Sequence, residues 1–279
     1  MSTENHIALL IDADNSPADK IDEILDELAK HGVINIRRAY GNWKSPALRS
    51  WEAVLHQYAI QPIQQFAYTK GKNATDMAMS IDAMDLLYSQ KLDGFCLASS
   101  DSDFTPLVMR IRANGLKVFG FGEQKTPLPF VNACSKFLYL ETLGTPPDAP
   151  AAPQTTVAAA PAETPPPEST PPAAPSSPPA APPRLANTSR KCSKELKGDT
   201  RLVNLLRKAV AAAAEEDGWA HLGSVGQHIS KQASFDSRNY GYAKLSELLQ
   251  AIDLFELDKR GKIVHVRDRR AAAGRKAAP

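Results

Sequence analysis

Hydrophobic and polar positions in residues 1–143 follow a strand-then-helix rhythm. Short, nearly continuous apolar runs predict strands, and segments with helical spacing separate them. Strands that are apolar on both faces and alternate with helices are typical of a parallel sheet covered by helices. We therefore predict an α/β, doubly wound, mostly parallel sheet. The strands are expected at 6–12, 33–40, 62–67, 94–99, 116–121 and 136–140, and the main helices at 17–31, 46–59, 75–90 and 103–114.

The first helix has recognisable start signals. Ser16 is the expected N-cap, Pro17 fills the first helical position and Asp19 is the expected capping-box acid. Its acidic side chains are interpreted as a solvated face; they are Asp22, Glu23, Asp26 and Glu27.

A second apolar pattern occupies residues 199–270. Helical spacing predicts helices over 202–213, 222–230 and 245–252, and two short strands follow at 255–257 and 263–266. The turn between these strands has the sequence KRGK, which suits a hairpin. Three helices and a β-hairpin predict a small winged helix-turn-helix domain.

The segment between the two patterns has a different composition. Residues 146–183 hold 15 of the 22 prolines of the chain. Such a segment buries little apolar surface, so we predict a disordered spacer that reaches about 40–100 Å. The predicted organisation is a first domain at 1–143, a linker at 144–198, a second domain at 199–270 and a basic disordered tail at 271–279.

Charge and cysteine content narrow the functional classes. Residues 1–141 carry 14 Lys and Arg against 17 Asp and Glu, whereas residues 200–279 carry 14 against 9. The basic C-terminal third would attract a polyanion, although a solvated lysine-rich surface explains it equally well. The three cysteines form no C-x-x-C pair, and no apolar run approaches the roughly 20 residues that span a bilayer. We expect a reducing, cytoplasmic setting and no membrane partner.

Carboxylates gather where the predicted strands end. Asp12 and Asp14 close the first strand, Asp101 and Asp103 follow the fourth, and Asp76 lies in the first turn of the helix after the third. The carboxyl ends of parallel strands share one edge of a sheet, where sites form. Crowded carboxylates repel one another unless a cation offsets the charge, and oxygen ligands suit Mg²⁺ or Mn²⁺. Phosphodiester hydrolysis is the chemistry that such a site supports.

Structural explanations compete for some of these residues. Asp14 and Asn15 could form an Asx turn, Asp103 could be only a helix N-cap, and Asp76 could serve only the helix dipole. Asp12 and Asp101 directly follow buried apolar strands, where a charge is rarely structural. Asp82 and Asp85 interrupt an apolar helix and are left out of the predicted site.

Three motifs add a family resemblance. The sequences IDADN, KGKNATD and LASSDSDFTPLVMRIRANGLKVFGFG, within residues 5–141, resemble the NYN domain, a branch of the PIN-like nucleases that includes LabA-like bacterial proteins. The resemblance implies a PIN-like sheet, an acidic Mg²⁺ or Mn²⁺ site and RNA cleavage. Asp12, Asp76 and Asp101 match the metal-binding acids of the family. Asp103 matches an additional acidic position, and Asn15 matches the polar residue after the first acid.

Basic residues of the first domain are candidates for RNA phosphate contacts. They are Lys70 and Lys72, just before Asp76, and Arg37 and Arg38 in the second strand. Ordinary surface charge is the alternative for each of them.

The C-terminal domain carries a second resemblance. The sequence FDSRNYGYAKL, followed by LSELLQAIDLFEL, resembles the OST-HTH or LOTUS domain over about 70 residues. The resemblance implies binding of RNA, with structured or G-rich RNA as a target, or of a protein partner. Candidate RNA contacts are Arg238, Tyr240, Tyr242 and Lys244 in the motif and Lys259, Arg260 and Lys262 in the wing.

These observations favour a metal-dependent ribonuclease with a tethered RNA-binding domain. A non-catalytic RNA-binding regulator that keeps the NYN fold is the alternative. A haloacid dehalogenase type of phosphatase is disfavoured, because Asn15 and Ser16 follow the D-x-D sequence where that family has Thr or Val. The RNA preference, the mode of cleavage and self-association as a homo-oligomer stay open.

Overall fold

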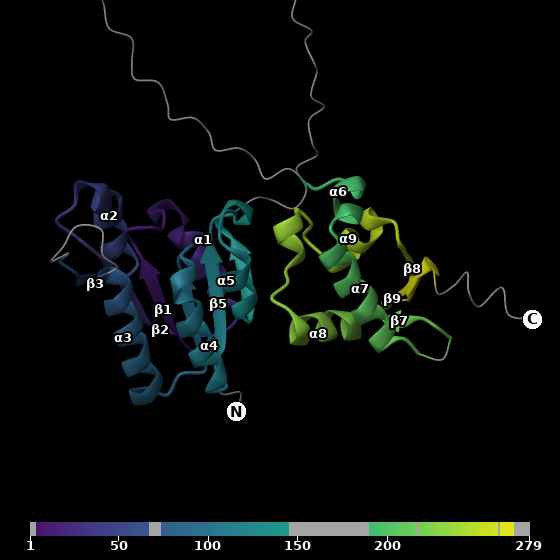
Figure 1. The fold of residues 1–279 in the computed structure, drawn as a ribbon, viewed down its shortest axis with the longest axis horizontal. Helices are drawn as coiled ribbons and strands as arrows, with labels where there is room; N and C mark the ends of the chain where they lie inside the picture. The colour runs from purple at the N-terminus through teal and green to yellow at the C-terminus, as the bar shows by residue number, and fades with distance from the viewer. Residues whose placement is uncertain (1–3, 67–73, 145–189, 216, 262, 271–279) are drawn as a thin grey trace, which may run out of the picture.

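The N-terminal domain is built on one six-stranded sheet (Figure 1). The computed structural model describes residues 4–66, 74–144, 190–215, 217–261 and 263–270. The strand order is β3-β2-β1-β4-β5-β6, and all five pairings are parallel. The strands are β1 (His6–Asp12), β2 (Val33–Gly41), β3 (Gln61–Gln64), β4 (Gly94–Ala98), β5 (Lys117–Gly122) and β6 (Lys136–Tyr139). Neighbouring β1 and β4 therefore end side by side, as expected from sequence.

Helices cover both faces of this sheet, because alternate residues of the central strand β1 point to opposite sides. Ile7, Leu9 and Ile11 pack against α1 (Ile21–Ala29) and α2 (Arg49–Gln57). Ala8 and Leu10 face the layer made by α3 (Ala74–Ser89), α4 (Thr105–Ala113) and α5 (Leu128–Ala133). The predicted α/β fold is confirmed.

The start of the first helix differs from the prediction. A 3-10 turn, η1 (Ala18–Lys20), precedes α1, and no side chain caps either element. The Ser16 hydroxyl instead donates to the Ala98 carbonyl at 2.9 Å. The predicted N-cap and capping box are therefore wrong. The Ser16 hydroxyl cannot cap the helix because it is hydrogen-bonded to the end of β4.

The C-terminal domain has its own core and a three-stranded antiparallel sheet of order β7-β9-β8. The elements are α6 (Ser193–Gly198), α7 (Thr200–Ala213), β7 (Ala220–His221), α8 (Leu222–Gln232), η5 (Ser237–Tyr240), α9 (Leu245–Ile252), β8 (Phe255–Arg260) and β9 (Ile263–Asp268). The three predicted helices and the hairpin are present as α7, α8, α9 and β8-β9, and the described domain also contains helix α6, turn η5 and the short strand β7.

One end of the predicted linker belongs to this domain. Helix α6 lies inside the range 144–198, and Leu196 is fully buried in the C-terminal core. Residues 190–198 are mostly polar, so the sequence pattern did not predict this helix. Its one apolar side chain, Leu196, packs into the C-terminal core. Residues 145–189 and the predicted tail at 271–279 lie outside the described residues. Across the described ranges, the helices are all too short or too polar to span a membrane.

The two domains contact each other (Figure 1). Turn η5 of the C-terminal domain lies against β6, the edge strand of the large sheet. The candidate active site lies at a different place, at the carboxyl ends of β1 and β4.

Candidate active site

Asp12 is the most buried member of the acidic group. It ends β1 with no exposed surface, and its Oδ2 accepts hydrogen bonds from Asn15 Nδ2 at 3.0 Å and Ser99 Oγ at 2.9 Å. Its Oδ1 is buried without a hydrogen-bond partner among the described residues. Burial raises the pKa of Asp12; the two hydrogen bonds oppose the shift, and the charges of Asp14 and Asp101 add to it. The neighbouring charges that act on this carboxylate, those of Asp14 and Asp101, are both negative.

The loop after β4 holds Asp101 and Asp103 beside β1. Ser99 Oγ accepts from the Asp101 backbone N–H at 3.1 Å, so one serine links Asp101 to Asp12. The Asp101 side chain accepts from the Asp103 backbone N–H at 2.8 Å and caps η3 (Ser102–Phe104). The helix cap here is thus Asp101 rather than Asp103. Asp101 therefore caps the η3 turn and also belongs to the acidic group at the edge of the sheet.

Asp76 brings a third element to the same place. It lies in the first turn of α3, and its pKa is raised to about 6 by burial and then by the charges of Asp12, Asp101, Asp103 and Asp14. The neighbouring Thr75 donates its hydroxyl to Asp14 Oδ2 at 3.1 Å, which holds the start of α3 beside the loop after β1. The ends of β1 and β4 and the start of α3 thus lie at one edge of the sheet, and a role for these acids as a site stays a prediction.

Asp14 and Asp101 line a cleft of about 530 Å³ formed by the loops after β1, β4 and β5. Two of its charged residues, Glu123 and Lys125, were not predicted from sequence. Lys125 lines the cleft and pairs with Glu123 at 2.6 Å, which raises the pKa of Lys125. The Glu123 backbone N–H donates to Ser100 Oγ at 2.8 Å and ties this loop to the β4 loop. The strand-end rule applied to β5 would have found both residues.

Two of the four predicted RNA contacts of the N-terminal domain, Arg37 and Arg38, have partners within that domain. Arg38 pairs with Asp82, whose other carboxylate oxygen accepts from the Tyr40 hydroxyl. Arg37 donates to the Tyr58 carbonyl at 2.8 Å. Lys70 and Lys72 lie outside the described residues.

The motif residues of the C-terminal domain divide into engaged and exposed groups. Arg238 binds Glu27 of the N-terminal domain. Tyr242 is buried and donates to the Lys191 carbonyl at 2.7 Å, and Tyr240 stacks on Phe235.

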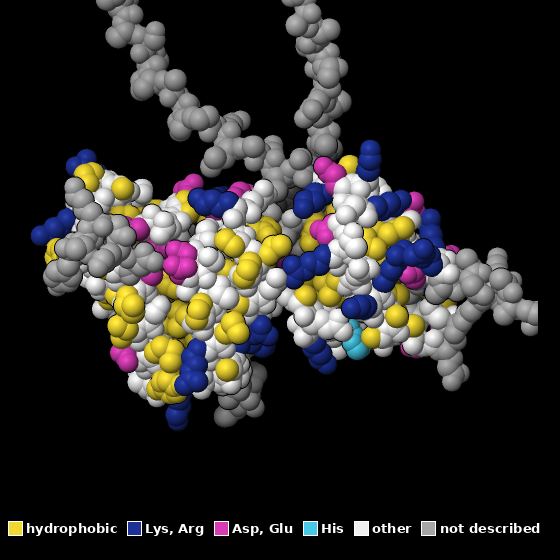
Figure 2. All heavy atoms as spheres, in the orientation of Figure 1, with side chains coloured by type: hydrophobic (Ala, Val, Ile, Leu, Met, Phe, Trp, Pro, Cys, Tyr) yellow, Lys and Arg dark blue, Asp and Glu magenta, His cyan; other side chains and the backbone are white. Residues whose placement is uncertain are grey.

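Three further residues of the motif and wing face solvent. Lys244, Lys259 and Arg260 are exposed, and Lys262 lies outside the described residues. Arg260 pairs with Asp258 at 2.9 Å and lies over the Trp219 ring. Lys and Arg side chains gather on the visible face of the C-terminal domain (Figure 2).

Two family models match separate segments of the chain. The family model of the NYN domain matches residues 6–141, and that of the OST-HTH/LOTUS domain matches residues 197–266. An uncharacterized protein of Methanocaldococcus jannaschii is 27% identical over 131 residues, which is 43% of this chain and 49% of that protein. The chain thus spans about half the length of this curated relative.

Two solved structures resemble parts of the chain. One, a protein of unknown function from Vibrio parahaemolyticus, covers 50% of this chain and 94% of its own, with 20% identity and a TM-score of 0.43. The other, an uncharacterized protein of Nitrosomonas europaea, covers 33% and 89%, with 29% identity and a TM-score of 0.25.

Proposed function

Because the chain contains an NYN domain followed by an OST-HTH/LOTUS domain, we propose that it is a metal-dependent ribonuclease whose C-terminal domain binds RNA. The supporting observation is the acidic edge of the sheet. Asp12 is fully buried with an unpartnered oxygen, and Asp76 is repelled by four neighbouring carboxylates. Destabilising charged groups of this kind cluster at functional sites of proteins.

The donor set fits Mg²⁺ or Mn²⁺. Asp12, Asp76 and Asp101 would hold the ion through carboxylate oxygens, and the unpartnered Oδ1 of Asp12 fits this role. Among the described side chains, no three of the His, Cys, Asp and Glu type converge closely enough to hold a metal, so binding would require some of them to rotate. When bound, such an ion lowers the pKa of a water molecule and neutralises phosphate charge.

The protein's own side chains would prepare this chemistry. Asn15 and Ser99 fix the Asp12 carboxylate by holding Oδ2, which leaves Oδ1 for a ligand. Asp103, exposed beside Asp101, would orient an attacking water or accept its proton. Lys125 is the basic side chain that lines the cleft and would bind the RNA phosphate.

We expect Lys125→Ala to weaken substrate binding more than it slows cleavage. Lys125 is exposed, and the ion pair that it forms among the described residues is with Glu123 of its own loop, so its loss should leave the fold intact. The loss of one phosphate contact should raise KM about tenfold and change kcat less than about threefold. Steady-state cleavage kinetics would measure both constants, with Lys91→Ala, exposed after α3, as the control. An unchanged KM would remove Lys125 from the substrate site.

Cleavage of a labelled, mixed-sequence single-stranded RNA tests the whole proposal. The wild type should cleave with Mn²⁺ or Mg²⁺ and not with EDTA, and Asp101→Asn should be inactive with either ion. Binding without cleavage under every condition would instead support a non-catalytic RNA-binding regulator. Cleavage that survives EDTA would contradict the metal dependence.

The proposed setting is the cytoplasm, which agrees with the free state of Cys96, Cys134 and Cys192. The exposed basic residues Lys244, Lys259 and Arg260 are the proposed RNA contacts of the C-terminal domain. A preference for structured or G-rich RNA, a protein partner and self-association stay predictions.

A further inference from the structure

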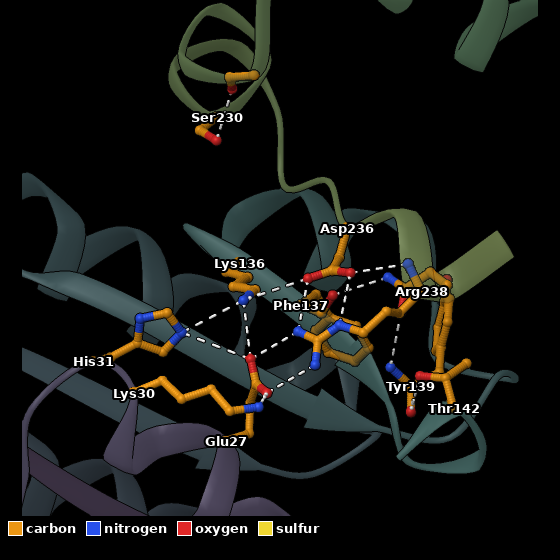
Figure 3. Close-up of polar contacts among 12 residues, drawn as sticks. Glu27, Lys30, His31, Lys136, Phe137, Tyr139, Thr142, Ser230, Asp236 and Arg238 are labelled. Carbon is orange, nitrogen blue, oxygen red and sulfur yellow. Dashed lines mark hydrogen bonds and ion pairs between the residues drawn. The ribbon is translucent and has the colours of Figure 1, made fainter. Parts of the chain in front are cut away.

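The two domains meet at a buried carboxylate (Figure 3). Glu27 lies in the last turn of α1, and its side chain is only 4% exposed, although the sequence pattern placed it on a solvated face. Its two oxygens accept from Arg238 Nη1 at 2.8 Å and Nη2 at 2.7 Å. Lys30 and Lys136 also bind it, at 2.7 and 3.0 Å. A buried charge needs partners of this kind, and Arg238 is the bidentate one.

The charge state of Glu27 reflects these contacts. Burial alone would raise the pKa of Glu27, but hydrogen bonds from Arg238, His31, Lys30 and Lys136 hold it well below its usual range. The carboxylate is therefore ionised at neutral pH, and the domain contact is an ion pair.

The residue next to Arg238 extends the contact onto the sheet. Asn239 Nδ2 donates to the Phe137 carbonyl at 2.9 Å, and its Oδ1 accepts from the Tyr139 backbone N–H at 3.3 Å. Both groups belong to β6, the edge strand, so the amide occupies the place of a neighbouring strand. Asp236 adds an ion pair with Lys136 at 3.3 Å. Three residues of one loop thus recognise the N-terminal domain.

This docking uses a residue that the OST-HTH resemblance assigns to RNA. The Arg238 guanidinium donates to Glu27 through both Nη atoms and to Asp236 through Nε and Nη2. Both bidentate faces of the guanidinium are thus occupied, so a phosphate can bind the face that carries both Nη atoms only by displacing Glu27. A cleft of about 450 Å³ beside it, lined also by Lys30 and Lys136, leaves space for a phosphate to approach.

We propose that Glu27 and RNA compete for Arg238, so that the docked arrangement is a closed state that RNA must open. The proposal rests on the RNA-binding function proposed above for the C-terminal domain. The Pro- and Ala-rich segment 146–183, predicted to be a spacer, is long enough to keep the domains connected when they separate. Only the open molecules can bind RNA through Arg238. The apparent affinity for RNA is therefore proportional to the fraction of molecules that are open.

Fluorescence anisotropy with labelled single-stranded RNA in EDTA tests the competition on the full chain, since binding is then measured without metal-dependent cleavage. Glu27→Ala should bind on the order of tenfold more tightly than the wild type, as expected if about nine-tenths of the molecules are closed. Asn239→Ala should also bind more tightly, and it changes no charge. Small-angle X-ray scattering without RNA should show a larger radius of gyration for both variants.

Two controls separate competition from simple charge removal. Asp26→Ala removes an exposed carboxylate from the same helix and should change RNA affinity less than twofold. In an Arg238→Ala background, Glu27→Ala should have no further effect on affinity.

Several results would overturn the competition. These are wild-type or weaker affinity in Glu27→Ala and Asn239→Ala, an equal gain in Asp26→Ala, or opening in scattering without a gain in affinity. If none of the proteins binds RNA, the proposed RNA-binding function fails as well, and the scattering data alone would report on the contact.

Discussion

Asp12→Asn is expected to abolish RNA cleavage while leaving the N-terminal domain as stable as the wild type. Asp12 is fully buried, and burial raises its pKa. A raised carboxylate pKa means that the folded state disfavours the charge, so at neutral pH this charge destabilises the fold. The neutral amide has nearly the same shape and removes that burden. It also removes a negative ligand oxygen from the proposed metal site.

The expected loss of activity is at least about 1000-fold, which corresponds to about 4 kcal/mol of transition-state stabilisation. Cleavage of labelled RNA with Mn²⁺ and thermal unfolding in EDTA measure the two effects separately. Asp19→Asn, an exposed carboxylate in η1, is the matched control and should change neither. An active Asp12→Asn variant would show that Asp12 has no role in catalysis. If the variant were clearly less stable, its loss of activity could be explained by unfolding alone.

Asp82→Ala is expected to destabilise the N-terminal domain by about 2 kcal/mol, because two buried or half-buried groups lose one shared partner. Asp82 accepts from both Arg38 and Tyr40. Tyr40 is fully buried, and its pKa is raised by burial and by the neighbouring Asp82. Without Asp82, the tyrosine hydroxyl and the guanidinium would stay in place with no acceptor between them. The figure is at the lower end for such pairs because the Asp82 and Arg38 side chains are each 25% exposed.

Urea unfolding of the full chain, followed by tryptophan fluorescence, measures this loss. Asp85→Ala lies exposed on the same helix and should change stability by less than about 0.5 kcal/mol. Arg38→Ala should be destabilised to a similar extent, and the double mutant should lose less than the sum of the two single losses. A stable Arg38→Ala with weakened RNA binding would return Arg38 to the RNA surface predicted from sequence.

Point variants are better tests of the C-terminal domain than its removal. Deleting residues 200–279 would leave Glu27 without Arg238 and would strip Asn239 from the edge of β6. An open edge strand and an unpaired buried carboxylate both favour aggregation or local unfolding. A truncated chain would therefore mix a loss of RNA binding with damage to the first domain.

The sequence alone determined the sheet and the place of the acids. Apolar runs such as His6–Asp12 and Gly94–Ala98 bury both faces, and this requires a parallel sheet covered by helices. The rule that parallel strands end at one edge then brings Asp12 and Asp101 together without further information. These inferences depend only on the local hydrophobic pattern and on the general rule that parallel strands end at the same edge of their sheet.

Only the tertiary structure decided the partners of individual charged side chains. Glu27 and Arg238 are 211 positions apart, and neither the helical pattern around Glu27 nor the motif around Arg238 indicates that they meet. The sequence pattern around Arg38, in β2, suggests a surface cation. In the structure Arg38 pairs with Asp82 of α3, which is 44 positions later in the chain. Local periodicity shows which face of an element is apolar. Whether a charged residue stays in solvent depends on what packs against it, and distant parts of the chain supply those neighbours.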